Sequence, residues 1–99
     1  MADHNLRAKV VVITGASSGF GKGAALQFGS RGASVVLAAR RDALLGDIAV
    51  VVETVGGKAL VVHTDVSHRE EVENLAEAAV GKFGCIDVWV NNAGGAALG

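Results

Sequence analysis

The sequence contains no tyrosine and no proline, and its 99 residues include a single cysteine, Cys85. One cysteine excludes an internal disulfide framework and is typical of a protein from the reducing cytoplasm, which is the location we expect. No apolar run approaches the roughly 20 residues of a membrane span, and the opening MADHNLRAK lacks the apolar region of a signal peptide. The net charge of −1 leaves no excess of basic residues. We therefore expect neither nucleic acid nor a membrane as a partner.

What the chain does contain is apolar residues, 51% of the total, arranged in short runs. This composition argues against disorder and suffices for one small domain, which we expect to span residues 1–99. The stretch VVVITGASSGFGK, residues 10–22, organises the rest. Its β-branched start predicts a strand buried on both faces, and the glycines that follow predict a tight turn and then a helix. Because a helix N-terminus attracts phosphate, the stretch predicts a dinucleotide pyrophosphate site.

Strands and helices are expected to alternate along the whole chain. The expected strands cover residues 9–14, 34–39, 59–64 and 86–90, and the expected helices cover 18–30, 42–55 and 67–83. Alternation of this kind predicts an α/β fold with a parallel sheet and helical crossovers. The doubly wound arrangement places the strands in the order 3-2-1-4, with a crevice between the first and fourth strands at their carboxyl ends.

The helices carry more detailed signals. Gly32 and Gly84 are placed to end the first and third helices in left-handed conformations. Ser67, followed three residues later by Glu70, predicts a capping box at the start of the third helix. In the second helix Asp42 is a plausible N-cap. The apolar stripe expected there prevails over the local strand preference of residues 50–52 and consists of Leu44, Ile48, Val51, Val52 and Val55.

Two glycine-bearing motifs fall at the rim of the predicted crevice. One is TGASSGFG, residues 14–21, and the other is NNAG, residues 91–94. The first resembles the T-G-x-x-x-G-x-G turn of the short-chain dehydrogenase/reductase family, and the second resembles another signature of that family. The resemblance covers residues 9–94 and implies a Rossmann-type fold that binds NAD(P)(H).

The glycine-rich turn is the first predicted cofactor site. Its hydroxyl groups can donate hydrogen bonds to phosphate oxygens, although Ser18 would serve equally well as a helix N-cap with no ligand. The residues assigned to the cofactor in this turn are Gly15, Ser17, Ser18, Gly19, Phe20 and Gly21.

Arg40 and Arg41 follow the second expected strand, where a dinucleotide fold meets the adenosine ribose. An acidic residue there selects NAD, whereas an arginine accommodates the 2′-phosphate of NADP. Ala39 precedes the pair, and the nearby Asp42 is explained by a helix cap, so we favour NADP(H) over NAD(H). The alternative is that both arginines are simply solvated.

The resemblance implies two further contacts. It places the carboxylate of Asp65 and the side chain of Val66 against the adenine, although Asp65 alone would be an ordinary residue at a strand end. It also places NNAG in the central sheet and along the nicotinamide-side ribose. The residues concerned are Asn91, Asn92, Ala93 and Gly94.

The resemblance implies hydride transfer between NADP(H) and an alcohol or carbonyl substrate in the full-length protein. In that family a tyrosine is the general acid/base, with a lysine and a serine beside it, all downstream of NNAG. Because tyrosine is absent, we expect these 99 residues to be the cofactor-binding part and to be inactive alone. The alternative is a stand-alone nucleotide-binding or structural module, while a methyltransferase is disfavoured by Arg40 and NNAG.

Two smaller expectations complete the sequence analysis. His63 and His68 lie close together in the sequence, but no third ligand pattern accompanies them, so no metal site is predicted. The apolar fourth strand, IDVWV, is expected at the edge of the sheet, where unpaired strands associate with other chains. We therefore expect self-association through this edge.

Overall fold

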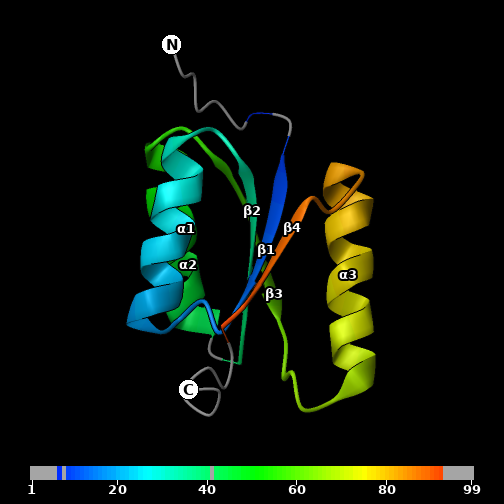
Figure 1. Ribbon diagram of the computed structural model, residues 1–99. Helices are drawn as coiled ribbons and strands as arrows, with labels where there is room; N and C mark the ends of the chain where they lie inside the picture. The colour runs from blue at the N-terminus through cyan, green and yellow to red at the C-terminus, as the bar shows by residue number, and fades with distance from the viewer. Residues whose placement is uncertain (1–6, 8, 41, 93–99) are drawn as a thin grey trace.

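The computed structural model describes residues 7, 9–40 and 42–92, and Figure 1 shows three layers with a sheet in the middle. The elements in chain order are β1 (Val10–Thr14), α1 (Gly19–Ser30), β2 (Ser34–Ala39), α2 (Asp42–Thr54), β3 (Lys58–His63), α3 (Arg69–Phe83) and β4 (Val88–Asn91). The expected strands and helices are all present, with ends that differ by at most two residues from the expected ones. The start of α3 also differs from the expected one in its hydrogen bonds, as described below.

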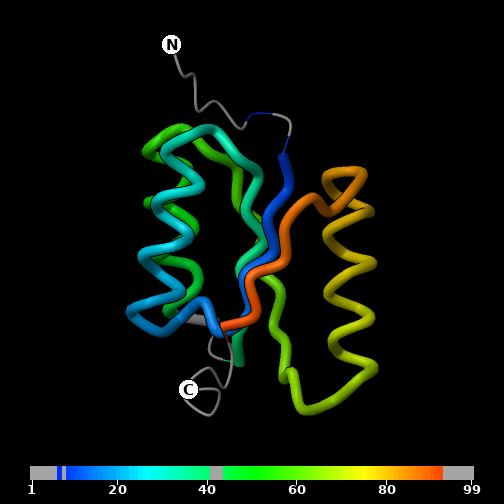
Figure 2. The backbone as a smooth tube through the Cα atoms, in the orientation of Figure 1, coloured from blue at the N-terminus to red at the C-terminus, as the bar shows by residue number. Residues whose placement is uncertain are grey.

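The four strands form one parallel sheet in the order β3-β2-β1-β4, which confirms the predicted doubly wound α/β fold. The register places Val12 between Val36 on β2 and Trp89 on β4. The chain reverses its direction across the sheet between β3 and β4, so β1 and β4 are neighbours although most of the chain separates them. Their carboxyl ends meet beside the start of α1 (Figure 2).

Alternate residues of the central strands enter different cores. One core lies between the sheet and the helices α1 and α2, and includes Ile13, Leu37 and Val52. The other lies under α3, on the opposite face, and includes Val12, Val36 and Leu75. Figure 1 shows the same division, with two helices on one side of the sheet and one on the other. A strand buried on both faces must be apolar throughout, which explains the β-branched runs.

The helix α2 forms as expected, but its buried face is shifted from the predicted stripe. Ile48 and Val52 are buried as expected, and the third buried apolar side chain is Leu45. The other predicted members, Leu44, Val51 and Val55, are exposed. Apolar residues lie on several sides of this helix, so spacing alone admits more than one face, and contact with the sheet selects one of them.

Gly32 and Gly84 adopt the left-handed conformations expected where α1 and α3 end, with φ angles of 88° and 92°. The N–H of Gly84 donates to the Val80 carbonyl at 2.7 Å, which closes the last turn of α3. Both helix ends therefore follow directly from the sequence.

β4 lies at the edge of the sheet, where its neighbour among the described residues is β1 alone. Trp89 is half-buried and packs on the core under α3, as expected for a core residue, while Val88 is exposed. At the entrance to the strand, Asp87 Oδ2 accepts the Val10 N–H at 2.8 Å, and this hydrogen bond holds the pKa of Asp87 below its ordinary value of 3.8.

Among the described residues, no helix combines the length and apolar character needed to cross a membrane.

The exposed edge at β4 leads to a prediction about association. We expect the chain to self-associate as its concentration rises, and we expect Val88→Lys to reduce this, because a charge on an edge strand disfavours pairing with another chain. Analytical ultracentrifugation over a concentration series measures the effect. Val80→Lys is the matched control, since Val80 is an exposed valine on α3 rather than on the edge. A monomer at every concentration, or an equal effect of both substitutions, would contradict the prediction.

Candidate cofactor site

The candidate site lies at the carboxyl ends of β1 and β4, around the turn that connects β1 to α1. Gly15 has a φ angle of 64°, a conformation that favours glycine, and it turns the chain out of β1. Its carbonyl accepts the Ser18 N–H at 3.1 Å. The Ser18 hydroxyl accepts the Gly21 N–H at 3.0 Å and so caps α1. Ser18 therefore has the N-cap role that the sequence allowed, whether or not a ligand is bound.

The later glycines of the turn differ in what surrounds them. A Cβ atom on Gly21 would lie 2.5 Å from the Gly15 carbonyl oxygen and 2.8 Å from the Cα of Ala16, so the fold itself requires glycine there. Gly19 has open space around the position of a Cβ. Phe20 is 79% exposed, and Ser17 is half-buried. Close packing inside the turn thus accounts for Gly21 but not for Gly19.

The end of β4 is hydrogen-bonded to this turn. The Thr14 hydroxyl donates to Asn91 Oδ1 and accepts the Asn92 N–H, both at 3.1 Å. The side-chain Nδ2 of Asn92 donates to the Gly15 carbonyl at 3.1 Å and to Ser18 Oγ at 2.7 Å. The two motifs expected at the crevice therefore meet. Thr14 was predicted as the end of a strand and as the first residue of the glycine-rich motif, but not as the group that joins the two strands. The sequence signal for that role is a hydroxyl residue at the end of an otherwise apolar strand.

Arg40 is exposed at the carboxyl end of β2. Asp65 follows β3, the parallel neighbour of β2, so the structure brings these two predicted residues to the same edge of the sheet. Arg41, Ala93 and Gly94, which were also assigned to the cofactor, lie outside the described residues.

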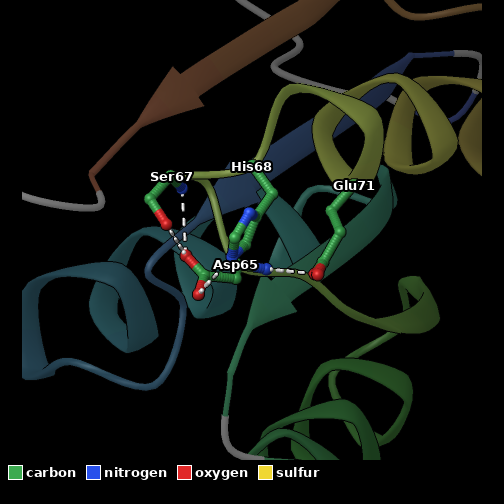
Figure 3. A network of polar contacts seen from close by, with 4 residues as sticks. All are labelled: Asp65, Ser67, His68 and Glu71. Atoms are coloured by element: carbon green, nitrogen blue, oxygen red, sulfur yellow. Dashed lines mark hydrogen bonds and ion pairs between the residues drawn. The ribbon is translucent and has the colours of Figure 1, made fainter.

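Asp65 follows β3 and organises the loop before α3 (Figure 3). Its Oδ1 accepts the Ser67 hydroxyl at 2.6 Å and the Ser67 N–H at 2.9 Å, and His68 Nε2 lies 3.6 Å from Oδ2. Glu71 reaches back from α3, and its Oε1 accepts the Asp65 N–H at 2.7 Å. The hydrogen bonds from Ser67 are the main cause of the lowered pKa of Asp65, with smaller contributions from His68 and Arg40. Val66 beside it is exposed.

This network corrects the predicted start of α3. The helix begins at Arg69, and its N-cap residue is His68, which makes no side-chain capping bond. The Ser67 hydroxyl donates to the Asp65 carboxylate instead of accepting from the helix, because a charged acceptor two residues away is the stronger partner. The residue that reaches back is Glu71 rather than Glu70, which is exposed.

Two further features lie near the site. His63 and His68 are both exposed, and no group of three or more potential ligands that could hold a metal ion occurs in the part of the chain that is described. A groove of about 500 Å³ runs along α1 from the turn. It is lined by Gly19, Phe20, Gly23, Ala24, Gln27, Phe28 and Arg31.

Comparison with known proteins agrees with the geometry. Residues 9–99 match the family model for short chain dehydrogenases. A curated relative from Listeria monocytogenes, an uncharacterized oxidoreductase, is 43% identical over 89 residues, which are 90% of this chain and 36% of that protein. The crystal structure of a hydroxysteroid dehydrogenase from Escherichia coli superposes with a TM-score of 0.85 at 32% identity, covering 90% of this chain and 38% of that one.

A third comparison includes a bound cofactor. The crystal structure of an NADH-dependent reductase complexed with NAD superposes with a TM-score of 0.82 at 28% identity, over 91% of this chain and 38% of the other. Because the family model matches nearly the whole sequence, this chain belongs to the short-chain dehydrogenase family. It spans 25% to 36% of the length of the first five curated relatives.

The loop before α3 provides a test of the corrected cap. We expect Glu71→Ala to lower the free energy of unfolding by about 1.5 kcal/mol, because the Asp65 N–H loses a charged acceptor. Glu70→Ala is the matched control: it removes an equal charge from the same helix turn, and we expect a change within about 0.5 kcal/mol. Urea unfolding measures both. Equal losses would instead indicate a general effect of charge at the helix N-terminus.

The glycine-rich turn provides a second test. We expect Gly21→Ala to destabilise the fold by about 1–3 kcal/mol, because the new methyl group overlaps the backbone of the turn. Gly23→Ala, on the same helix with open space around it, should stabilise the fold by about 0.5–1 kcal/mol, as alanine does in helices. Thermal and urea unfolding distinguish the two variants. A neutral Gly21→Ala would mean that the turn relaxes and that its tightness is not required.

Proposed function

We propose that this chain is the NADP(H)-binding part of an oxidoreductase that transfers hydride between NADP(H) and an alcohol or carbonyl group in the full-length protein. The observation that carries the proposal is the hydrogen-bonded junction of the glycine-rich turn with the end of β4, at the point where the sheet reverses direction. Open α/β sheets bind their ligands at such a point. The family membership supports a nicotinamide dinucleotide as the ligand.

The residues of the turn suit the pyrophosphate of such a cofactor. The first intrahelical hydrogen bond of α1 runs from the Lys22 N–H to the Ser18 carbonyl at 2.8 Å. The N–H groups of Gly19 and Phe20 precede that bond and point out of the helix end, where an anion is favoured. Because Gly19 has no side chain, a phosphate oxygen can approach its backbone closely. When bound, the cofactor supplies or accepts the hydride.

The other proposed contacts follow the rim of the sheet. Arg40 and Arg41 would bind the 2′-phosphate, because guanidinium groups pair with phosphate in a bidentate fork. Asp65 would accept from the adenine amino group through Oδ2, since Oδ1 already accepts two hydrogen bonds from Ser67. Val66 is exposed beside it and would pack on the base. The proposed contacts with the nicotinamide-side ribose are Asn91, Asn92, Ala93 and Gly94.

A second candidate function is a nucleotide-binding or structural module without chemistry. Both candidates accommodate the absence of tyrosine, because the residue expected to act as general acid/base is not among these 99. In both cases residues 1–99 would form one dinucleotide-binding domain, and we keep the proposed cytoplasmic location. Both candidates predict that these 99 residues alone do not oxidise NADPH in the presence of aldehydes and ketones. The same assay on the full-length protein distinguishes the candidates, because only the oxidoreductase proposal requires activity there.

The proposed function is tested by calorimetric titration of the purified chain with NADPH and with NADH. Tighter binding of NADPH would support an autonomous NADP(H) module. A folded chain that binds neither dinucleotide would contradict the proposed function for these residues.

Arg40→Ala tests the choice between the two cofactors. A hydrogen bond to a charged group contributes about 1.5–3 kcal/mol, so we expect NADPH affinity to fall about ten- to a hundredfold and NADH affinity to remain nearly unchanged. Arg31→Ala is a suitable control, because Arg31 is an exposed arginine at the far end of α1. Equal losses for NADPH and NADH would refute the assignment of Arg40 to the 2′-phosphate.

A further inference from the structure

The Ser18 hydroxyl receives two hydrogen bonds inside the protein. The Gly21 N–H donates to its oxygen at 3.0 Å, and Asn92 Nδ2 donates to the same oxygen at 2.7 Å. A hydroxyl oxygen has two lone pairs and one proton. Both lone pairs are therefore engaged, and the proton is the part of the group left to interact with something else.

The amide of Asn92 can adopt only one of its two orientations. Its Nδ2 lies 3.1 Å from the Gly15 carbonyl oxygen, which can only accept. Rotation of the amide by 180° would set Oδ1 against that carbonyl and leave two acceptors facing each other. The two protons of Nδ2 match the two acceptors, Gly15 O and Ser18 Oγ. The contacts thus determine which atom of Asn92 faces Ser18.

Asn92 is also held in place through its backbone. Its N–H donates to the buried Thr14 hydroxyl, and Asn91 before it pairs with Thr14 in the β1–β4 register. Ser18 itself is exposed at the rim of the turn. The side-chain amide of Asn92 is therefore held rigidly, and the Ser18 hydroxyl to which it donates lies where a ligand can reach it.

We propose that Asn92 is a positioning residue that acts through Ser18: by filling the second lone pair of the hydroxyl, it commits the Ser18 proton to an acceptor-only ligand group. A pyrophosphate oxygen has that chemistry. This inference rests on the proposed function, since it assigns the pyrophosphate of the dinucleotide to Ser18. It differs from a purely structural role of Asn92, which would affect all ligands of the chain alike.

A double-mutant cycle tests the coupling. We expect Asn92→Ala to weaken NADPH binding about tenfold when Ser18 is present, which corresponds to one hydrogen bond to a charged group. In the Ser18→Ala background the same substitution should weaken binding several-fold less, because no hydroxyl remains to orient and only the proposed contact of Asn92 with the ribose is lost. Ser18→Thr should restore most of the affinity, since threonine also supplies a hydroxyl. Losses that simply multiply in the double variant would overturn the inference.

A second ligand separates positioning from general damage to the fold. Adenosine 2′-monophosphate keeps the adenine, the ribose and the 2′-phosphate but lacks the pyrophosphate, so its affinity should be unchanged by Asn92→Ala. An equal loss for both ligands would overturn the inference. If Asn92→Ala does not fold by circular dichroism, Asn92→Asp replaces it with nearly the same shape. Its carboxylate would take the Ser18 proton, and we expect a loss of NADPH affinity greater than tenfold, with adenosine 2′-monophosphate again unaffected.

The outcomes distinguish this inference from the proposed function. If the unmodified chain binds NADPH and the cycle shows no coupling, the inference fails and the proposed function stands. If the folded, unmodified chain binds neither NADPH nor adenosine 2′-monophosphate, the proposed function fails and the inference fails with it.

Discussion

The hydroxyl group of Thr14 joins the two strands between which the site forms. It is buried at the last position of β1, and a buried hydroxyl must find partners inside the protein. It finds them on β4, where it donates to Asn91 and accepts from Asn92. These two bonds place Asn92 over the glycine-rich turn, and the turn in turn sets the start of α1. The geometry of the site thus depends on one threonine that has no direct part in the proposed chemistry.

The sequence predicted the strands, the helices and the glycine-rich turn well, because each depends mainly on residues close together in the chain. The β-branched runs identified strands buried on both faces, and their alternation with helices predicted the strand order that the structure confirms. The glycines after β1 predicted a tight turn, and the structure shows how it forms, with a positive φ angle at Gly15 and a close backbone approach at Gly21. The meeting of the two motifs followed from topology alone, since carboxyl ends of parallel strands share one edge of the sheet.

Competition among partners is what the sequence could not resolve. On α2, apolar residues on several sides of the helix fit more than one stripe. Contact with the sheet determines that Leu45 is buried and Leu44 is exposed. Before α3, the Ser67 hydroxyl could have capped the helix or bound a nearby carboxylate, and in the structure it donates to the carboxylate of Asp65. The contact of Asn92 with Ser18 joins residues 74 positions apart, a distance in sequence over which no spacing rule applies.

The unequal cover of the sheet has a dynamic consequence. α3 contributes only Leu75 and Ala79 as fully buried side chains to its face, whereas the opposite face is covered by two helices. Elements with fewer buried apolar contacts open at a lower free-energy cost, so we expect α3 to detach more readily than the two helices α1 and α2, which share one core. Because Glu71 on α3 accepts a hydrogen bond from the Asp65 loop, we expect each such opening to release the adenine end of the proposed site and to leave the turn before α1 formed. The adenine of a bound dinucleotide would then contact a surface that opens more often than the turn that binds its pyrophosphate.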